Sequence, residues 1–355
     1  MYTIECFDGF PIEYESFLIK KYDSFVTTCK YLEIFYSAID IHYMLIHENN
    51  SLIDVMVFDN KGNTALCLNS LAQLDINILG VFTQNLFKNY PSITKIEFSS
   101  TYSNNQLDKS ILTVRSDDYV IKLPPSIDNY FQQLGSSTRS NVKKHKNKFL
   151  REYPQANFVT KIGDEIDEST IDKIIRLNFE RIISKKEVPH ADHTQTNKHY
   201  RYAQHYGCVT YIEIDGLIVA GCIAYMSNES MYSNFLSHDN NYSKYNAGQL
   251  CMLYLIQVSI ERGFSTFHLL SGECEYKTRF LAKPYPLYSN IVYKTVSIPF
   301  IISKIKEFYS RIIYQIKLSK FVTPVKNAYK KFSKKSDKQL CKLEYIVLLI
   351  LILNS

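Results

Sequence analysis

The sequence CVTYIEIDGLIVAGCIAYMSNESMYSNFLSH, residues 208–238, consists of three apolar segments separated by two short polar turns. Asp215-Gly216 forms the first turn and Asn228-Glu229 the second. Two such residues between apolar segments are typical of a β-hairpin. The pattern therefore predicts three antiparallel strands in series, over residues 208–214, 217–226 and 231–238.

A polar loop and an apolar helix follow these strands, where residues 239–263 read DNNYSKYNAGQLCMLYLIQVSIERG. We expect the helix over residues 250–262, with Gly263 ending it. A glycine-bearing loop exposes backbone N–H groups, Gly248 lets a ligand approach the backbone closely, and the helix start adds partial positive charge. Such a segment can bind phosphate or pyrophosphate, although an ordinary helix-capping turn has the same composition.

The flanking segments extend the α/β pattern. Upstream, we expect helices over residues 127–134, 136–153 and 169–184, a strand over 157–161, and a helix that ends at Tyr206. Downstream, we expect strands over residues 265–269 and 285–295. The helix at 136–153 is distinctive because it holds six lysines and arginines between Arg139 and Arg151, and no acid in that interval.

The first third of the chain repeats the order of hairpin and then helix. The turn signal is NKGN at residues 60–63, and Asp75 can cap a helix that extends to about Lys88. A polar linker is expected over residues 99–108. We expect strands over residues 42–47, 54–59, 64–69, 93–98 and 118–123.

Four passages resemble, in their order along the chain, the GNAT fold of acyl-CoA N-acyltransferases. They are residues 134–144 (LGSSTRSNVKK), 215–221 (DGLIVAG), 242–250 (YSKYNAGQL) and 272–277 (GECEYK). They are most similar to the CelD-like branch, the GNAT proteins associated with cellulose and capsule polysaccharides. That branch is related to the FemAB peptidyltransferases.

The resemblance implies the fold class α/β (α+β), with tandem GNAT-like domains built from mixed, mostly antiparallel sheets flanked by helices. We expect a degenerate GNAT-like domain over residues 1–125, a GNAT acyltransferase domain over 126–298, and a basic, partly apolar helical tail over 299–355. In the first domain, residues 70–75 lack glycine and add the acid Asp75. Because an acid repels pyrophosphate, we expect this half to hold no cofactor. We expect it instead to form a wall of the groove that binds the acceptor of the acyl group.

The resemblance also implies that the second domain binds acetyl-CoA or another acyl-CoA as co-substrate. Backbone N–H groups of the loop would bind the pyrophosphate, and a lysine beside it would add positive charge. The expected contacts are Lys244, Asn246, Ala247, Gly248 and Gln249.

Transfer from a thioester requires a base for the acceptor amine or hydroxyl and a proton for the leaving thiolate. His238 ends the third predicted strand and is the expected base, and Tyr276 is the expected proton donor. Lys277 is expected to hold a phosphate or the acceptor. Arg139 and Lys143 on the basic helix are expected to hold a phosphorylated acceptor, with a solvated helix face as the alternative.

The cysteines and histidines do not indicate a metal site. The eight cysteines are scattered singly, without a C-x-x-C pair, as in a reduced cytosolic protein. His190 and His193 enclose Asp192, but no matching Cys or Glu motif follows. We therefore expect no metal. The N-terminus lacks a signal-peptide pattern, so we expect a cytoplasmic location.

The tail is strongly basic. Residues 299–355 hold twelve Lys and Arg against three Asp and Glu, a net charge of +9, whereas the whole chain carries +6. We expect peripheral binding to the inner, anionic face of a membrane through residues 299–353, with a solvated basic helix as the alternative. The apolar run at 345–353 rises only about 14 Å as a helix, roughly half of a bilayer core, and does not span it.

These features support three hypotheses. The first is an acyl-CoA-dependent N- or O-acyltransferase, most simply an acetyltransferase, acting on a sugar, nucleotide-sugar or lipid-linked glycan in polysaccharide or envelope synthesis. The second is a FemAB-like peptidyltransferase that uses aminoacyl-tRNA, although no nucleic-acid motif accompanies the charge and nucleic acid is the weaker partner. The third is a non-catalytic scaffold at the membrane surface. Fold alone does not choose among them.

Overall fold

The computed structural model describes residues 2–36, 40–189, 191–272 and 274–318, with side chains up to residue 308. The chain forms two units, residues 1–301 and 302–355. His190 and the apolar run at 345–353 lie outside the described residues, as does most of the predicted tail. None of the helices described here has both the length and the apolarity to cross a membrane.

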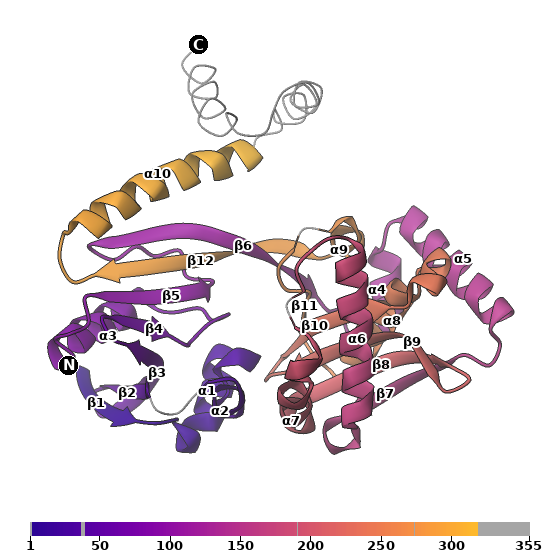
Figure 1. Ribbon diagram of the computed structural model, residues 1–355, viewed down its shortest axis with the longest axis horizontal. Helices are drawn as coiled ribbons and strands as arrows, with labels where there is room; N and C mark the ends of the chain where they lie inside the picture. The colour runs from indigo at the N-terminus through magenta and orange to yellow at the C-terminus, as the bar shows by residue number, and fades with distance from the viewer. Residues whose placement is uncertain (1, 37–39, 190, 273, 319–355) are drawn as a thin grey trace, which may run out of the picture. The chain divides into compact units, whose positions relative to one another are not determined.

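The described residues of the first unit form one twelve-stranded mixed sheet (Figure 1), in the order β1-β2-β3-β4-β5-β12-β6-β11-β10-β9-β8-β7. The strands are β1 Tyr2–Asp8, β2 Ile41–Glu48, β3 Ser51–Lys61, β4 Thr64–Cys67, β5 Lys95–Thr101, β6 Ser110–Lys122, β7 Asn157–Ile162, β8 Gly207–Ile214, β9 Leu217–Met226, β10 Ser230–His238, β11 Thr266–His268 and β12 Lys283–Tyr293. The mixed, mostly antiparallel α/β architecture confirms the predicted fold class.

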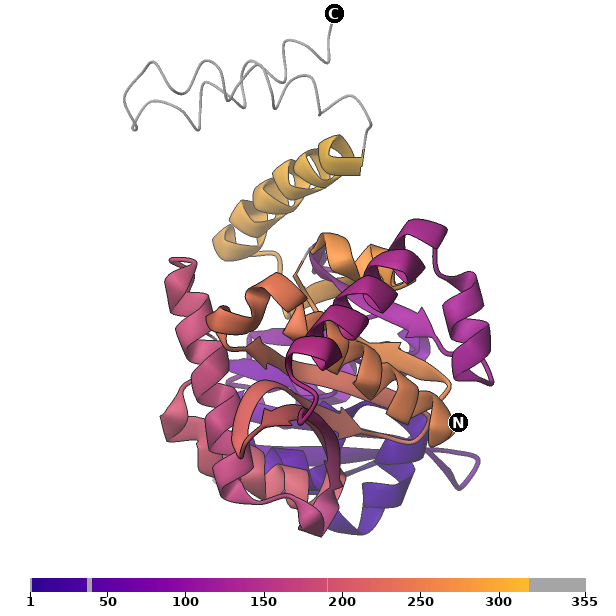
Figure 2. The same cartoon turned by 90° about the vertical axis from the view of Figure 1, so that its right-hand side faces the viewer.

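Helices cover both faces of the sheet (Figure 2). They are α1 Glu15–Tyr22, α2 Cys29–Phe35, α3 Ile76–Asn89, α4 Ile127–Gln133, α5 Ser136–Glu152, α6 Glu168–Ser184, α7 Thr196–Tyr206, α8 Ala247–Glu261 and α9 Glu275–Arg279. A further helix, α10, comprises Ile298–Leu318 and begins at the end of the first unit. Successive side chains of a strand point to opposite faces. Accordingly, Cys222 of β9 packs in the core that contains α8, whereas the next residue, Ile223, packs in the core that contains α6 and α7.

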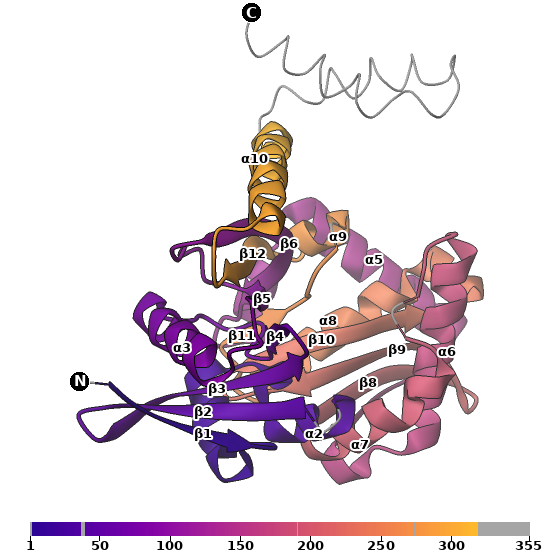
Figure 3. The same cartoon turned by 60° about the vertical axis from the view of Figure 1, so that its left-hand side comes forward.

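Both halves of the sheet contain the same succession of elements. In the second half, β8, β9 and β10 are antiparallel in series, and β11 then pairs parallel to β10 after α8. In the first half, β3 and β4 form a hairpin, and β5 pairs parallel to β4 after α3. Figure 3 brings this half forward, with α3 beside its strands. The predicted repetition of hairpin and helix is therefore confirmed.

Strands β6 and β12 join the halves. β12 pairs with β5 of the first half along one edge and with β6 along the other, and the last residues of β6 pair with β11 of the second half. Figure 1 shows these two long strands side by side. The domain boundary that we predict at residue 125 falls just after β6, so the two halves share a continuous sheet across that boundary.

A third hydrophobic core also connects the halves. Phe25 and Ile34 from the first half pack with Ile174, Tyr202 and Tyr225 from the second. Burial of aromatic side chains of this size contributes strongly to stability and fixes orientation. The first half is thereby held against the face of the second half that α6 and α7 cover.

The structure extends some of the predicted elements. β1, α1 and α2 were not expected from the sequence, because their short lengths leave little periodicity to detect. β6 begins at Ser110 rather than at residue 118, because its stretch from 110 to 118 pairs with β12 along one edge, apart from the bulged Arg115. α8 begins at Ala247, three residues before the expected start.

Candidate functional site

A cavity of about 440 Å³ opens where β10 and β11 separate. Of the described residues, their parallel pairing covers only Ser230–Tyr232 opposite Thr266–His268. Beyond it, the walls come from α6, the end of β10, the start of α8 and the segment that leads from β11 into α9. We call this space the donor cavity. Its volume is in the range of small-molecule and cofactor sites.

The first turn of α8 faces the donor cavity with unpaired backbone donors. The first helical hydrogen bond runs from the Leu250 N–H to the Asn246 carbonyl at 3.0 Å, so the N–H groups of Ala247, Gly248 and Gln249 precede it. Asn246 lies in the left-handed region, at φ 54°, and its side chain makes no capping hydrogen bond. This helix start is therefore available to an anion.

A smaller cavity of about 230 Å³ lies on the other side of the same turn. Thr138, Asn141 and His145 of α5 line it, together with Arg279 at the end of α9. Asn246 and Gln249 line both this cavity and the donor cavity. The α8 start is thus placed between two spaces, as a long ligand with a central diphosphate would require.

His238 lies in the donor cavity against Gly248. A Cβ atom on residue 248 would come within 2.9 Å of the His238 Nδ1 atom. The missing Cβ atom therefore leaves room for the imidazole, and the predicted ligand contact of Gly248 stays a prediction. Burial, with Arg181 and Lys185 nearby, lowers the pKa of His238 below its usual value. The imidazole is then neutral at pH 7 and can accept a proton.

Tyr276 and Lys277 also line the donor cavity. Burial raises the pKa of Tyr276 well above its usual value, so its hydroxyl keeps its proton at neutral pH. Lys277 is only 4% exposed, and its ammonium donates to the carbonyls of Leu269, Leu270 and Ser271 at 2.9, 2.9 and 3.0 Å. All three of its protons are used, so it fixes the segment after β11.

Four of the predicted contacts lie outside both cavities, and one of them, Ala247, is buried in the core. Lys244 is exposed, with its ammonium 4.9 Å from the centre of the Tyr245 ring and 4.0 Å from the Glu152 carboxylate. Arg139 donates to the carbonyl of Gln132 at 2.7 Å and so supports the end of α4. Lys143 is exposed on α5. Their predicted ligand contacts remain predictions.

The structure adds residues that sequence reasoning missed. Arg181 of α6 and Lys185, the residue that follows α6, line the donor cavity, and the Arg181 Nε atom is buried without a partner. Asn234 lines it too, because a register shift between Ser233 and Phe235 makes it a β-bulge. In the sequence, α6 shows only its apolar periodicity, and a bulge has no reliable signature.

Within the described residues, no group of three or more His, Cys, Asp and Glu could hold a metal ion.

Comparison with known proteins supports the predicted fold. Residues 136–278 match the family model described as an acetyltransferase (GNAT) domain. The matched part of the chain includes the residues that line the donor cavity. No curated protein matches the sequence.

Several solved structures share the fold over most of the chain. FemX is 8% identical, with 81% of this chain and 96% of that chain covered, at a TM-score of 0.59. The C-terminal domain of a protein described as a lysylphosphatidylglycerol synthetase from Agrobacterium fabrum is 10% identical, with coverages of 79% and 91% and a TM-score of 0.54. L-PGS from Bacillus licheniformis is 12% identical, with coverages of 86% and 98% and a TM-score of 0.52. At these identities the likeness concerns the fold.

Proposed function

We propose that this protein is an acyl-CoA-dependent N- or O-acyltransferase, most simply an acetyltransferase, whose acceptor is a sugar or a precursor of an envelope polysaccharide. The observation that carries the proposal is the first turn of α8, whose first three N–H groups precede its helical hydrogen bonds and whose residues Asn246 and Gln249 line two cavities. The GNAT domain over residues 136–278 supports the reaction class. The resemblance to the CelD-like branch supports the acceptor class.

The residues present fit an acyl-CoA. The N–H groups of Ala247, Gly248 and Gln249 would hold its diphosphate, and the donor cavity would receive its thioester arm. When bound, acyl-CoA supplies an activated acyl group. The acceptor amine or hydroxyl bonds to the acyl carbon while the bond from that carbon to sulfur breaks. His238 takes the proton that the acceptor loses, and Tyr276 gives one to the departing sulfur.

Titration calorimetry with acetyl-CoA tests the donor. We expect Gln249→Glu to weaken binding by about tenfold, because it places a carboxylate at the turn that faces both cavities. The matched control is Gln132→Glu, an exposed position on α4 outside both cavities. No heat with acetyl-CoA or longer acyl-CoAs at millimolar concentration would contradict the proposal.

An aminoacyl-tRNA-dependent transferase is the second candidate. The observation that favours it is the basic helix α5, whose residues border the smaller cavity beside the α8 start. This chain shares its fold with FemX and with the C-terminal domain of the lysylphosphatidylglycerol synthetase from Agrobacterium fabrum. Binding of tRNA that Gln249→Glu weakens, with no binding of acyl-CoA, would favour this candidate. A scaffold would bind neither donor.

A further inference from the structure

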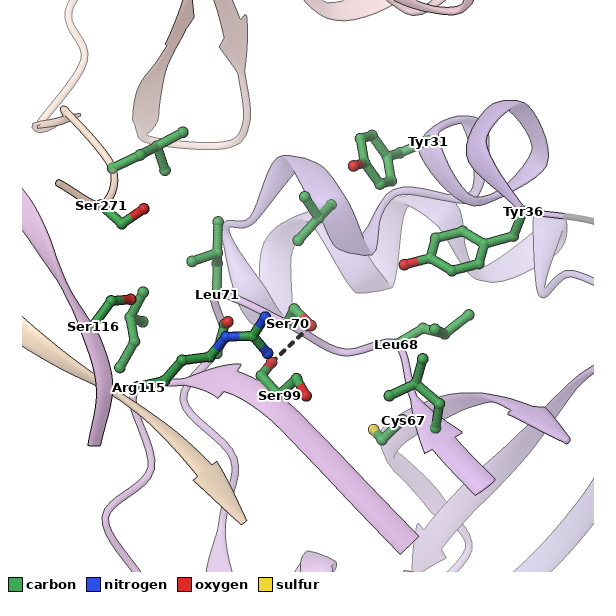
Figure 4. Close-up of a pocket in the computed structure, with 15 residues that line it drawn as sticks. Tyr31, Tyr36, Cys67, Leu68, Ser70, Leu71, Ser99, Arg115, Ser116 and Ser271 are labelled. Atoms are coloured by element: carbon green, nitrogen blue, oxygen red, sulfur yellow. Dashed lines mark hydrogen bonds between the residues drawn. The ribbon is translucent and has the colours of Figure 1, made fainter. Parts of the chain in front are cut away.

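A second large cavity, of about 490 Å³, lies at the junction of the two halves (Figure 4). The first half supplies the residues after β4, the end of β5, and Arg115 and Ser116 of β6. The second half supplies Leu270 and Ser271. We call it the Arg115 cavity. Ser271 also lines the donor cavity, so the two spaces meet at this residue.

The Arg115 cavity occupies in the first half the place that the donor cavity occupies in the second. β4 and β5 pair in parallel only to Cys67 and Phe98, and Leu68 and Ser99 beyond them line the cavity. The neighbouring helix start differs, however. The Asp75 side chain accepts from the N–H groups of α3, at 2.8 Å from the Asn77 nitrogen, so a diphosphate is not held there. Any anion in this cavity needs another partner.

Arg115 supplies that positive charge. The register between β6 and β12 shifts from Ser116 opposite Leu287 to Val114 opposite Tyr288, which leaves Arg115 as the extra residue of a β-bulge. A bulge changes the direction in which a side chain points. Figure 4 shows the guanidinium directed toward Ser70 and Ser99. Within the described part of the chain it has no hydrogen-bond or ion-pair partner.

The cavity walls include unusual backbone conformations. Leu71, Ser100 and Leu270 lie in the left-handed region, with φ of 50°, 57° and 53°, and all three line the cavity. Hydrogen bonds hold the first two in place, since the Leu71 N–H donates to the Ser100 carbonyl at 2.8 Å. Lys277 holds Leu270 by its carbonyl. Strained residues of this kind concentrate at ligand sites, where the surrounding structure fixes them.

We infer that the Arg115 cavity is the acceptor site, and that Arg115 binds an oxyanion of the acceptor, a phosphate or a carboxylate. The inference rests on the proposed transferase function. The guanidinium is free of internal partners and its planar fork matches such oxyanions. The serine hydroxyls around it suit a hydroxyl-rich acceptor such as a sugar. Ser271, shared by both cavities, marks where acceptor and acyl group meet.

Titration calorimetry of the full chain tests this assignment, with glucose 1-phosphate, glucuronate and uncharged glucose as probes. We expect at least one anionic sugar to bind and glucose not to bind. The sugar that binds identifies the oxyanion as a phosphate or a carboxylate. Arg115→Gln should weaken that binding at least tenfold and leave the thermal unfolding midpoint unchanged. The matched control, Arg201→Gln, changes an exposed arginine of α7 that lines neither cavity and should bind as the unaltered chain does.

Other outcomes overturn the assignment. They are the absence of binding of both anionic sugars, unchanged binding by Arg115→Gln, and loss of binding in Arg181→Gln instead, which would place the anion in the donor cavity. Acetyl-CoA is titrated in parallel. If it fails to bind while Arg115 still governs anion binding, the proposed donor is wrong and the anion site stands. If acetyl-CoA binds equally to the unaltered chain and to Arg115→Gln while neither anionic sugar binds, the acceptor assignment alone fails.

Discussion

In the candidate site, the absence of a side chain at Gly248 determines where the His238 imidazole can lie. The backbone of Gly248 is an ordinary first helical turn, so no positive φ requires glycine there. The requirement comes from the imidazole that fills the space of the missing Cβ atom. A larger residue at 248 would displace His238, and loss of activity in such a variant would not by itself identify a ligand contact.

Lys277 gives a prediction at the scale of the residue. Replacing it with Met removes the ammonium and leaves the carbonyls of Leu269, Leu270 and Ser271 without their shared donor. We expect the free energy of unfolding to fall by about 2–4 kcal/mol, because buried acceptors lose their partner. Urea unfolding followed by circular dichroism measures the change.

The matched control is Lys146→Met on the exposed side of α5, which should alter the free energy of unfolding by less than about 0.5 kcal/mol. If Lys277→Met unfolds at the same urea concentration as the unaltered chain, the ammonium does not support this segment. A role in ligand binding would then become the better account of Lys277.

At the scale of the element, β-bulges bring polar side chains into both large cavities. Asn234 is the extra residue in β10 and Arg115 the extra residue in β6. A regular strand alternates its side chains between two faces, and an inserted residue interrupts that alternation. The same strands that form the sheet can therefore supply ligand-facing groups without losing their pairing on either side.

The packing of α7 on β9 gives a prediction for pH dependence. His199 of α7 is buried, its Nδ1 atom lies 2.7 Å from the Tyr225 hydroxyl, and burial lowers its pKa to about 4. The unfolded chain has the ordinary value of about 6.5 and so binds a proton first as the pH falls. The contribution to stability is therefore present above pH 6.5 and lost toward pH 4. We expect a loss of about 2 kcal/mol between pH 7 and pH 5.

Urea unfolding at both pH values measures this loss. His199→Gln removes the titrating group, and its free energy of unfolding should depend less on pH by that amount, whatever its absolute stability. An equal pH dependence in the two proteins would show that His199 is not held in its neutral form.

At the scale of the whole molecule, two strands tie two similar halves into one sheet. β6 of the first half pairs with β11 of the second, and β12 of the second half pairs with β5 of the first. The third core, with Phe25 and Tyr202, packs them together a second time. The Arg115 cavity lies at this junction and takes residues from both halves. The relation between the halves, rather than either half alone, creates the space that we assign to the acceptor.

The basic tail gives a prediction that belongs to the whole chain. Lys330, Lys331, Lys334 and Lys335 form a cluster outside the described residues. Each cation near an anionic membrane contributes about 1 kcal/mol, so changing all four to Gln should weaken binding to phosphatidylglycerol vesicles by at least about tenfold. Vesicle sedimentation measures the effect, with phosphatidylcholine vesicles as the control. Equal sedimentation of both proteins would exclude an electrostatic role for this cluster.

The sequence by itself determined the order of elements in the second half and the place of the turn at the start of α8. The signals are local: Asp215-Gly216 fixes a hairpin, and the polar residues before Leu250 mark a helix start, because turn geometry depends on a few adjacent residues. The same kind of signal located the hairpin near Gly62 and the cap at Asp75 in the first half.

Only the tertiary structure decided which side chains share a cavity. Arg115 and Ser271 are far apart in the chain and line the same cavity because β11, which leads to Ser271, pairs with the end of β6, the strand that holds Arg115. Lys277 could be singled out from its motif, but its use in holding three carbonyls depends on how the segment after β11 folds back. Such contacts follow from long-range pairing and packing, which local residue patterns do not specify.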